Sequence, residues 1–215
     1  MMQLRTRVKM CGMTRLQDIE QAVQLGVDAI GLIFHPQSVR CVGLQQAITL
    51  TNNLPPFVDT IAVMVNPEEA FVRTLLNELP IQCLQFHGDE SSDFCQQFDK
   101  PFIKTIHPTH AEQIENCILA FDQAQALLFD SAVGLQRGGT GLPINWQLIP
   151  KTPTKPFILA GGLTQFNVSE AIQVCNPYAV DVCSGIETTG GVKDHDKMEA
   201  FIKAVRRTNN ESRTS

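Results

Sequence analysis

Two residues that could act as an acid and a base stand at the ends of short apolar runs. Asp130 follows Leu127-Leu128-Phe129, and Cys11 follows Val8-Lys9-Met10 and precedes Gly12. A carboxyl group and a thiol are both suited to moving protons, the thiol once a nearby cation or helix N-terminus lowers its pKa. A carboxyl group in such a place is costly to bury without a partner or a function. The alternatives are a capping aspartate and a buried apolar thiol.

A lysine near Cys11 is expected to form a buried ion pair. Lys9 lies two residues before Cys11, so both side chains point to the same face of an extended strand. A buried lysine needs an acidic partner, and we expect Asp181, in the last apolar run, to provide it. Such a pair has either a structural or a catalytic role.

Two glycine clusters in the last third of the chain favour a phosphate site. They are Ala160-Gly161-Gly162-Leu163 and Cys183-Ser184-Gly185-Ile186-Glu187, and each follows an apolar run. Glycines there expose backbone N–H groups and let a phosphate approach. Tight turns explain either cluster alone. A third cluster, Gly138-Gly139-Thr140-Gly141, suits a mobile flap over a site or a plain turn.

Three more polar side chains follow apolar runs. Arg40 comes after Phe34-His35-Pro36-Gln37-Ser38-Val39, and its planar guanidinium is suited to binding a carboxylate, although a solvated surface arginine is the default. His87 and His107 either line a pocket or satisfy turns. The sequence shows no metal-ligand spacing, no nucleotide-binding glycine loop and no nucleophile elbow, so we expect neither a metal nor a cofactor.

The elements that must position these residues alternate between β-rich runs and amphipathic helical segments. The predicted strands are Val8–Cys11, Ala29–Phe34, Thr60–Val65, Cys83–His87, Phe102–Ile106, Ala126–Phe129, Phe157–Ala160 and Ala179–Val182. The predicted helices are Thr14–Leu25 with Thr14 as its N-cap, Leu44–Asn53, Glu68–Leu79, Ser91–Phe98, Ala111–Ala120, Asn145–Ile149, Asn167–Val174 and Asp194–Arg207.

Eight such units in 215 residues give about 27 residues per unit, close to the minimum for a strand, a helix and two loops. The pattern predicts an α/β fold, a single (β/α)8 TIM barrel over residues 1–208, with a polar, frayed tail at 209–215. A doubly wound open sheet is the alternative. The weakest element is Asn145–Ile149, because Pro143 and Pro150 flank it. In a barrel the active site lies where strands end, which is where the residues above stand.

Composition excludes several classes of protein. The chain has 17 Lys+Arg against 22 Asp+Glu, a net charge of −5 and a pI near 5.5, without a basic block, so we expect neither a nucleic-acid nor a membrane partner. No apolar run approaches the ~18 residues of a membrane span, and Met1–Arg7 lacks the apolar stretch of a secretion signal. Seven cysteines without a Cys-x-x-Cys pair predict reduced thiols. We therefore expect a cytoplasmic protein.

Taken together, the motifs resemble phosphoribosylanthranilate isomerase over nearly the whole chain. The segments that carry the resemblance are Val8-Lys9-Met10-Cys11-Gly12-Met13-Thr14, Gly31-Leu32-Ile33-Phe34 through Ser38-Val39-Arg40, Gln85-Phe86-His87-Gly88-Asp89-Glu90, Phe129-Asp130-Ser131, Gly138-Gly139-Thr140-Gly141, Ala160-Gly161-Gly162-Leu163 and Asp181-Val182-Cys183-Ser184-Gly185-Ile186-Glu187. The opening Lys-x-Cys-Gly-x-Thr and the joint spacing are specific, whereas a single glycine motif is not.

The resemblance implies an Amadori rearrangement in tryptophan biosynthesis, on a barrel without a cofactor. By this resemblance Cys11 is the general base, Asp130 the general acid, and Arg40 the ligand of the anthranilate carboxylate. Backbone groups around Gly161, Gly162, Ser184 and Gly185 would bind the phosphate, and His87 would line the substrate pocket. The expected partner is a phosphorylated sugar-anthranilate substrate, and the sequence leaves monomer and homodimer open.

The sequence departs from the family pattern at two positions. Val39 replaces the proline of the usual Ser-Pro-Arg, which removes a restriction on the loop that carries Arg40. Cys183 replaces the first serine of the usual Asp-Val-Ser-Ser-Gly.

Two rival functions stay open. The related sugar isomerase of histidine biosynthesis has a substrate with two phosphates and needs a second glycine-rich loop, which the first half of this chain lacks. A barrel that binds a phosphosugar without turning it over is the other rival.

Overall fold

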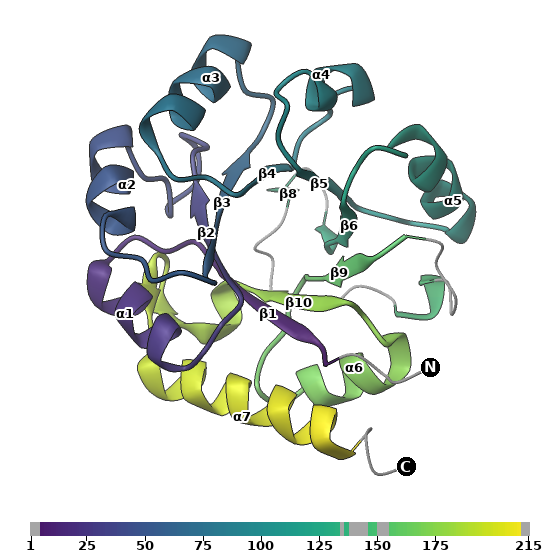
Figure 1. Ribbon diagram of the computed structural model, residues 1–215. Helices are drawn as coiled ribbons and strands as arrows, with labels where there is room; N and C mark the ends of the chain where they lie inside the picture. The colour runs from purple at the N-terminus through teal and green to yellow at the C-terminus, as the bar shows by residue number, and fades with distance from the viewer. Residues whose placement is uncertain (1–4, 134–135, 138–145, 150–154, 212–215) are drawn as a thin grey trace.

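The chain folds into a closed barrel of parallel strands surrounded by helices (Figure 1). The computed structural model describes residues 5–133, 136–137, 146–149 and 155–211. The barrel strands, in chain order, are β1 (Arg7–Cys11), β2 (Ala29–Ile33), β3 (Asp59–Met64), β4 (Cys83–Phe86), β5 (Phe102–Ile106), β6 (Ala126–Phe129), β9 (Phe157–Leu159) and β10 (Ala179–Val182). The first and last strands pair, with Lys9 opposite Asp181, so the predicted barrel is confirmed and the open sheet is excluded.

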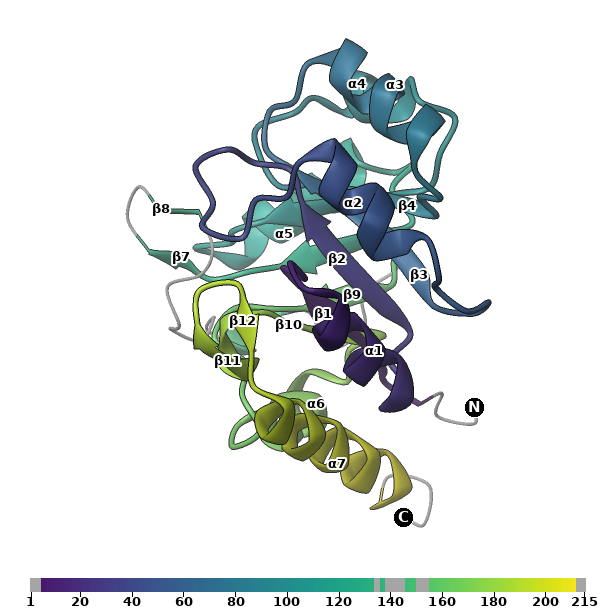
Figure 2. The same cartoon turned by 90° about the vertical axis from the view of Figure 1, so that its left-hand side faces the viewer.

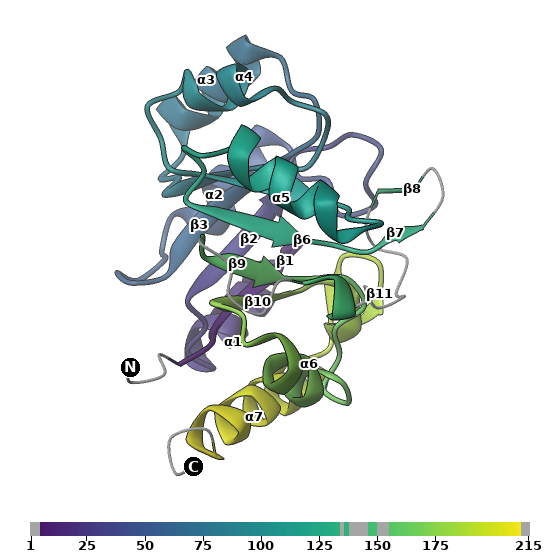
Figure 3. The same ribbon diagram turned by 90° about the vertical axis from the view of Figure 1, so that its right-hand side faces the viewer.

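Helices cover the outside of the barrel, as Figures 1 and 3 show. They are α1 (Leu16–Gln24), α2 (Leu44–Thr51), α3 (Glu69–Glu78), α4 (Ser92–Gln96), α5 (Ala111–Ala120), α6 (Val168–Cys175) and α7 (His195–Glu211). None of the helices in the described residues is long and apolar enough to cross a bilayer.

Three helix predictions need correction. Of the segment Asn145–Ile149, the structure describes 146–149 and shows only the 3-10 turn η1 (Trp146–Leu148), because the flanking prolines leave too little chain for a longer helix. Thr14 is not an N-cap, since α1 starts at Leu16 and the Thr14 hydroxyl donates to the Gly191 carbonyl. Helix α7 continues past Arg207 to Glu211, so the expected frayed tail is helical at its start.

Besides the barrel strands and helices, the described residues form two short hairpins and a second 3-10 turn. The hairpins are β7 (Ala132–Val133) with β8 (Gln136–Arg137), and β11 (Glu187–Thr189) with β12 (Val192–Lys193). The 3-10 turn η2 (Ser184–Ile186) connects β10 to β11. Figure 2 shows the two hairpins projecting on the same side of the molecule.

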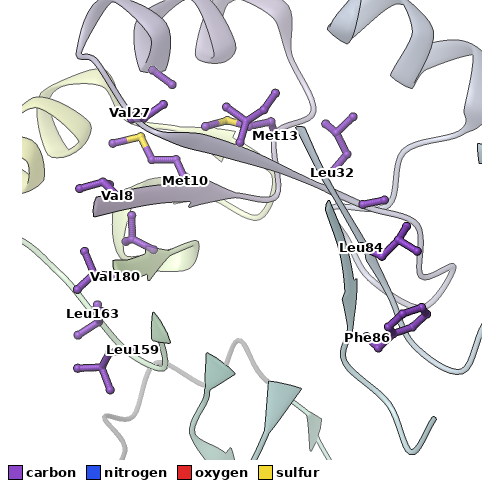
Figure 4. Close-up of a cluster of buried hydrophobic side chains, with 14 of the residues drawn as sticks. Val8, Met10, Met13, Val27, Leu32, Leu84, Phe86, Leu159, Leu163 and Val180 are labelled. Atoms are coloured by element: carbon purple, nitrogen blue, oxygen red, sulfur yellow. The ribbon is translucent and has the colours of Figure 1, made fainter. Parts of the chain in front are cut away.

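Successive side chains of each barrel strand point alternately outward and inward, so the buried apolar residues form two layers. Side chains such as Val8, Met10 and Val180 pack outward against the helices, where Figure 4 shows them with their neighbours. Cys11 belongs to the smaller layer inside the barrel, together with Ala29, Ile61, Val63, Ile103, Ala126, Leu128, Ile158, Ala160 and Ala179. Lys9 and Cys11 therefore share the interior, as their spacing predicts.

Candidate active site

Polar side chains from several strands meet at the carboxyl ends of the barrel strands. Cys11 ends β1, Asp130 follows β6, and His87 and His107 follow β4 and β5. The buried Asp181 on β10 is close enough to both Cys11 and Asp130 for their charges to affect its pKa. The acid and the thiol predicted from the sequence thus face one interior.

Lys9 and Asp181 form the predicted buried pair beneath the thiol. Lys9 Nζ lies 2.8 Å from Asp181 Oδ2, and both side chains are buried. Burial alone would lower the pKa of Lys9, but the charges of Asp181 and Cys11 raise it, so the ammonium group stays charged. Burial raises the pKa of Asp181 to about 7, against the attraction of Lys9. The carboxyl group of Asp181 and the thiol of Cys11 therefore both lie close to the same cation.

Cys11 has a second sulfur beside it. Met10 pairs with Val182 across β1 and β10, and this register places Cys11 next to Cys183. A hydrogen bond from Cys183 lowers the pKa of Cys11 well below its ordinary value, and the charges of Lys9 and Lys193 act in the same direction against burial. The same contact raises the pKa of Cys183. Of the two thiols, Cys11 is therefore the more acidic.

Gly31 on β2 makes room for the thiol. A Cβ atom at this position would lie 2.7 Å from Cys11 Sγ and 3.1 Å from Lys9 Nζ. No side chain larger than hydrogen fits without displacing one of these groups. Sequence reasoning missed this role, although Gly31 interrupts an otherwise apolar strand and such a glycine is a signal of close approach.

Arg40 is not a free surface arginine. Its Nε and Nη2 atoms donate to the Glu187 carboxylate at 2.9 and 2.6 Å, and Lys193 Nζ reaches the same carboxylate at 2.8 Å. Burial would raise the pKa of Glu187, but these two cations lower it. The aliphatic part of the Arg40 side chain lies against Gly12, where a Cβ atom would lie 2.7 Å from Arg40 Cδ. Sequence reasoning missed Glu187 and Lys193 as the groups that position Arg40.

Asp130 is held by its own loop and lies beside His87. The Ser131 backbone N–H donates to Asp130 Oδ1 at 2.7 Å. His87 Nε2 lies 3.4 Å from Asp130 Oδ2 without forming a hydrogen bond. A Cβ atom on Gly161 would lie 3.0 Å from Asp130 Oδ1, so the glycine after β9 leaves space for the carboxyl group.

A buried pair fixes the loop that carries His87. The Glu90 carboxylate accepts from the backbone N–H groups of Asn66 and Gly88, and Lys104 Nζ lies 2.8 Å from it. Lys104 also donates to the Gly88 carbonyl at 2.6 Å. Sequence reasoning missed Lys104, whose only signal is a charged residue inside an apolar strand.

The predicted glycine loops after β9 and β10 lie against each other. Gly161 and Gly162 have φ angles of +79° and +66°, the left-handed region that glycine tolerates best. A Cβ atom on Gly185 would collide with the Leu163 carbonyl, so the two loops are in contact. Ser184 begins the η2 turn at this place. The cluster Gly138-Gly139-Thr140-Gly141 lies outside the described residues.

Comparisons with known proteins agree on one family. The sequence profile described as N-(5'-phosphoribosyl)anthranilate (PRA) isomerase matches residues 8–204. A protein of Legionella pneumophila subsp. pneumophila (strain Philadelphia 1) named N-(5'-phosphoribosyl)anthranilate isomerase is 60% identical over 201 residues, 94% of this chain and 97% of the relative. A relative of the same name from Nitrosococcus oceani is 44% identical over 202 residues, 94% of this chain and 98% of its own.

Solved structures give the same result. Phosphoribosyl anthranilate isomerase from Thermotoga maritima is 32% identical with a TM-score of 0.87, covering 94% of this chain and 99% of that one. A second structure carries the same enzyme name and is in complex with reduced 1-(o-carboxyphenylamino)-1-deoxyribulose 5-phosphate. It is 32% identical with a TM-score of 0.84 and the same coverage.

Proposed function

The chain belongs to the phosphoribosylanthranilate isomerase family, and we propose that Cys11 is the general base and Asp130 the general acid of its reaction. The enzyme catalyses the Amadori rearrangement of N-(5-phosphoribosyl)anthranilate to 1-(2-carboxyphenylamino)-1-deoxyribulose 5-phosphate in tryptophan biosynthesis. One observation carries the assignment: a thiol whose pKa is lowered by its neighbours faces the same barrel interior as a buried aspartate.

The acid acts first. Asp130 donates a proton to the ring oxygen of the ribose, and the bond between C1′ and that oxygen breaks as the nitrogen lone pair forms a C=N⁺ bond. The iminium ion makes the hydrogen on C2′ acidic. The Cys11 thiolate removes this proton, and the electron pair left on C2′ neutralises the iminium to give an enolamine. Tautomerisation of the enolamine gives the ketone, so one acid and one base are sufficient.

Two anion-binding regions fix the ends of the substrate. The backbone N–H groups of Gly161, Gly162, Ser184 and Gly185 bind the phosphate, which is supported by the contact between the loops after β9 and β10. Arg40 binds the anthranilate carboxylate with a guanidinium that Glu187 already orients. Binding both ends holds the sugar between the acid and the base, which lowers the entropic part of the barrier.

His87 lines the pocket beside the acid. Its ring lies within 3.4 Å of Asp130, so it contacts the part of the sugar that Asp130 protonates. We place the enzyme in the cytoplasm, because its seven cysteines are free thiols and its substrate carries a phosphate that does not cross membranes unaided.

Replacing each proposed proton carrier tests the mechanism. Cys11→Ala and Asp130→Asn should each lower kcat by ~10²–10⁴-fold, the range for a lost general base or acid. The change should fall on kcat rather than on KM, because both groups act in the transition state. Fluorescence of the anthranilate group reports consumption of the substrate.

The same assay separates binding from chemistry. Arg40→Ala should raise KM with a smaller change in kcat, because a lost charged hydrogen bond is worth about 1.5–3 kcal/mol of binding. Circular dichroism should show all three variants folded. Near-normal turnover in folded Cys11→Ala would remove Cys11 from the role of base.

A further inference from the structure

We propose that His87, His107 and Asp130 form a binding site for Zn²⁺ at the mouth of the barrel. One ligand atom from each residue lies within 4.8 Å of the others. Among the described residues, this is the group of three potential metal ligands that meets this distance. The three side chains follow the consecutive strands β4, β5 and β6. The sequence gives no metal-ligand spacing because the barrel, and not the local chain, brings these residues together.

The distances suit a tetrahedral ion. Zn–N and Zn–O bonds of about 2.0–2.2 Å in a tetrahedron place neighbouring ligand atoms roughly 3.3–3.6 Å apart. His87 Nε2 and Asp130 Oδ2 are already 3.4 Å apart, and His87 Nε2 is buried without a hydrogen bond. The His87 and His107 rings have centroids 5.3 Å apart at 49°, so small ring rotations bring a nitrogen of each toward one point.

The donor set fits zinc better than harder cations. Two imidazoles and one carboxylate are the ligands that Zn²⁺ takes in sites with an open fourth position, whereas Mg²⁺ and Ca²⁺ prefer oxygen alone. All three side chains are buried or half-buried, which excludes much of the competing water.

Neighbouring groups are in place to orient two of the ligands. The Gln85 side-chain amide lies 3.3 Å from His87 Nδ1, and Gln85 Oε1 is buried without a partner. Turning this amide by 180° lets Oε1 accept a hydrogen bond from Nδ1–H, which leaves the Nε2 lone pair for the ion. The Ser131 N–H already holds Asp130 Oδ1, so Oδ2 is the oxygen turned toward His87.

A zinc ion at this site should inhibit the isomerase reaction. It would occupy the oxygen of Asp130 that lies toward His87, so Zn²⁺ should inhibit turnover and a chelator should restore it. This effect on activity rests on the proposed role of Asp130 as the acid, whereas binding of the ion does not.

Direct titration tests the site. Chelator-washed protein is titrated with Zn²⁺ in competition with a chromophoric chelator, and we expect one ion per chain. Loss of a residue that only hydrogen-bonds to a metal ligand typically weakens metal binding by roughly 10–100-fold. His107 is proposed as a ligand itself, so His107→Asn should weaken Zn²⁺ binding by more than this. His110→Asn is the matched control, because His110 is an exposed histidine three residues further on, and it should bind as the unaltered protein does.

Co²⁺ in place of Zn²⁺ distinguishes this site from the thiols of Cys11 and Cys183. Nitrogen and oxygen ligation gives visible d–d bands without thiolate-to-metal charge transfer. No stoichiometric binding, unchanged affinity in folded His107→Asn, or a thiolate charge-transfer band would each overturn the proposal. If Zn²⁺ binding depends on His107 but does not inhibit turnover, the metal site is supported and the role of Asp130 as the acid is contradicted.

Discussion

At the scale of single residues, the environment of Cys11 differs from that of the other thiols. Lys9, Lys193 and the Cys183 hydrogen bond lower the pKa of Cys11. Burial raises the pKa of the remaining cysteines away from the site, which are Cys41, Cys83, Cys95, Cys117 and Cys175. Because only the thiolate is a strong nucleophile, Cys11 should react first with an alkylating reagent.

The Cys183 contact can be tested through the titration of Cys11. The rate of Cys11 alkylation, followed by mass spectrometry of its peptide, should rise with a midpoint below the ordinary thiol pKa of 9.0. Cys183→Ala removes the main cause of the low pKa and should move the midpoint upward. Cys183→Ser keeps a hydrogen-bond donor and should leave the midpoint near that of the unaltered protein. Equal midpoints in Cys183→Ala and the unaltered protein would contradict the hydrogen bond.

Residue types and spacing predicted the pairing of Lys9 with Asp181, which the structure confirms. They also predicted Cys11 and Asp130 as the base and the acid, and these two roles stay a prediction. Residue types and spacing did not predict the other site contacts between side chains that lie far apart in the sequence. Arg40 and Glu187 are 147 positions apart, and no local pattern indicates that a buried carboxylate already holds this arginine. Cys183 becomes informative only once the β1–β10 register is known.

At the scale of elements, Asp18 connects helix α1 to the last part of the chain. The Asp18 side chain is fully buried. Its carboxylate accepts hydrogen bonds from Arg15 Nη2 at 2.7 Å and from the Lys193 backbone N–H at 3.2 Å, and it lies 3.0 Å from His195 Nε2. Burial raises the pKa of Asp18, but these partners lower it below 3.8 overall. One carboxylate therefore joins α1, β12 and the start of α7.

Asp18→Asn should lower the free energy of unfolding at neutral pH by about 1–3 kcal/mol, the cost of weakening a buried charged hydrogen-bond network. The folded-state pKa is below the unfolded one, so the advantage of aspartate is fully present above pH 3.8 and is lost as the pH falls through the folded-state value. Urea unfolding at several pH values measures the difference between the two proteins. A difference that stays constant as the pH falls would exclude the ionised carboxylate as its source.

Hydrophobic periodicity predicted the ends of most strands and helices to within two residues. Strands β5, β6 and β10 and helix α5 have the predicted ends, and most others differ by one or two residues. The failure at Asn145–Ile149 has a physical cause, since a helix needs more chain than two prolines leave there. Helix α7 runs longer than expected because Asn209 donates to the Thr6 carbonyl and so belongs to the packed structure.

At the scale of the whole molecule, β1 and β10 close the barrel around the Lys9–Asp181 pair. Replacing Lys9 alone leaves a buried acid without its cation, and Lys9→Met should cost about 3–5 kcal/mol of stability. The double variant Lys9→Met/Asp181→Leu should recover most of this loss, because apolar groups of similar size often replace a buried ion pair without cost. Thermal unfolding of both variants measures the recovery.

The matched control is Lys203→Met on α7. Lys203 is exposed and pairs with Glu199 on the helix surface, so its replacement should change stability by less than about 1 kcal/mol. A double variant no more stable than Lys9→Met would show that the pair supports the barrel through its charges and not through the volume it fills.

Because Lys9 and Asp181 lie near opposite ends of the chain, the ribosome must synthesise nearly the whole barrel before they can pair. Lys9 is synthesised 172 positions before Asp181, and at roughly 5–20 residues per second this interval lasts roughly 9–34 s. During that time the emerging chain carries Cys11 without Cys183, Asp181 or Lys193 beside it. A translation product that stops before β10 therefore contains Cys11 without Cys183 and Lys193, two of the groups that lower its pKa, so we expect no isomerase turnover from partial chains.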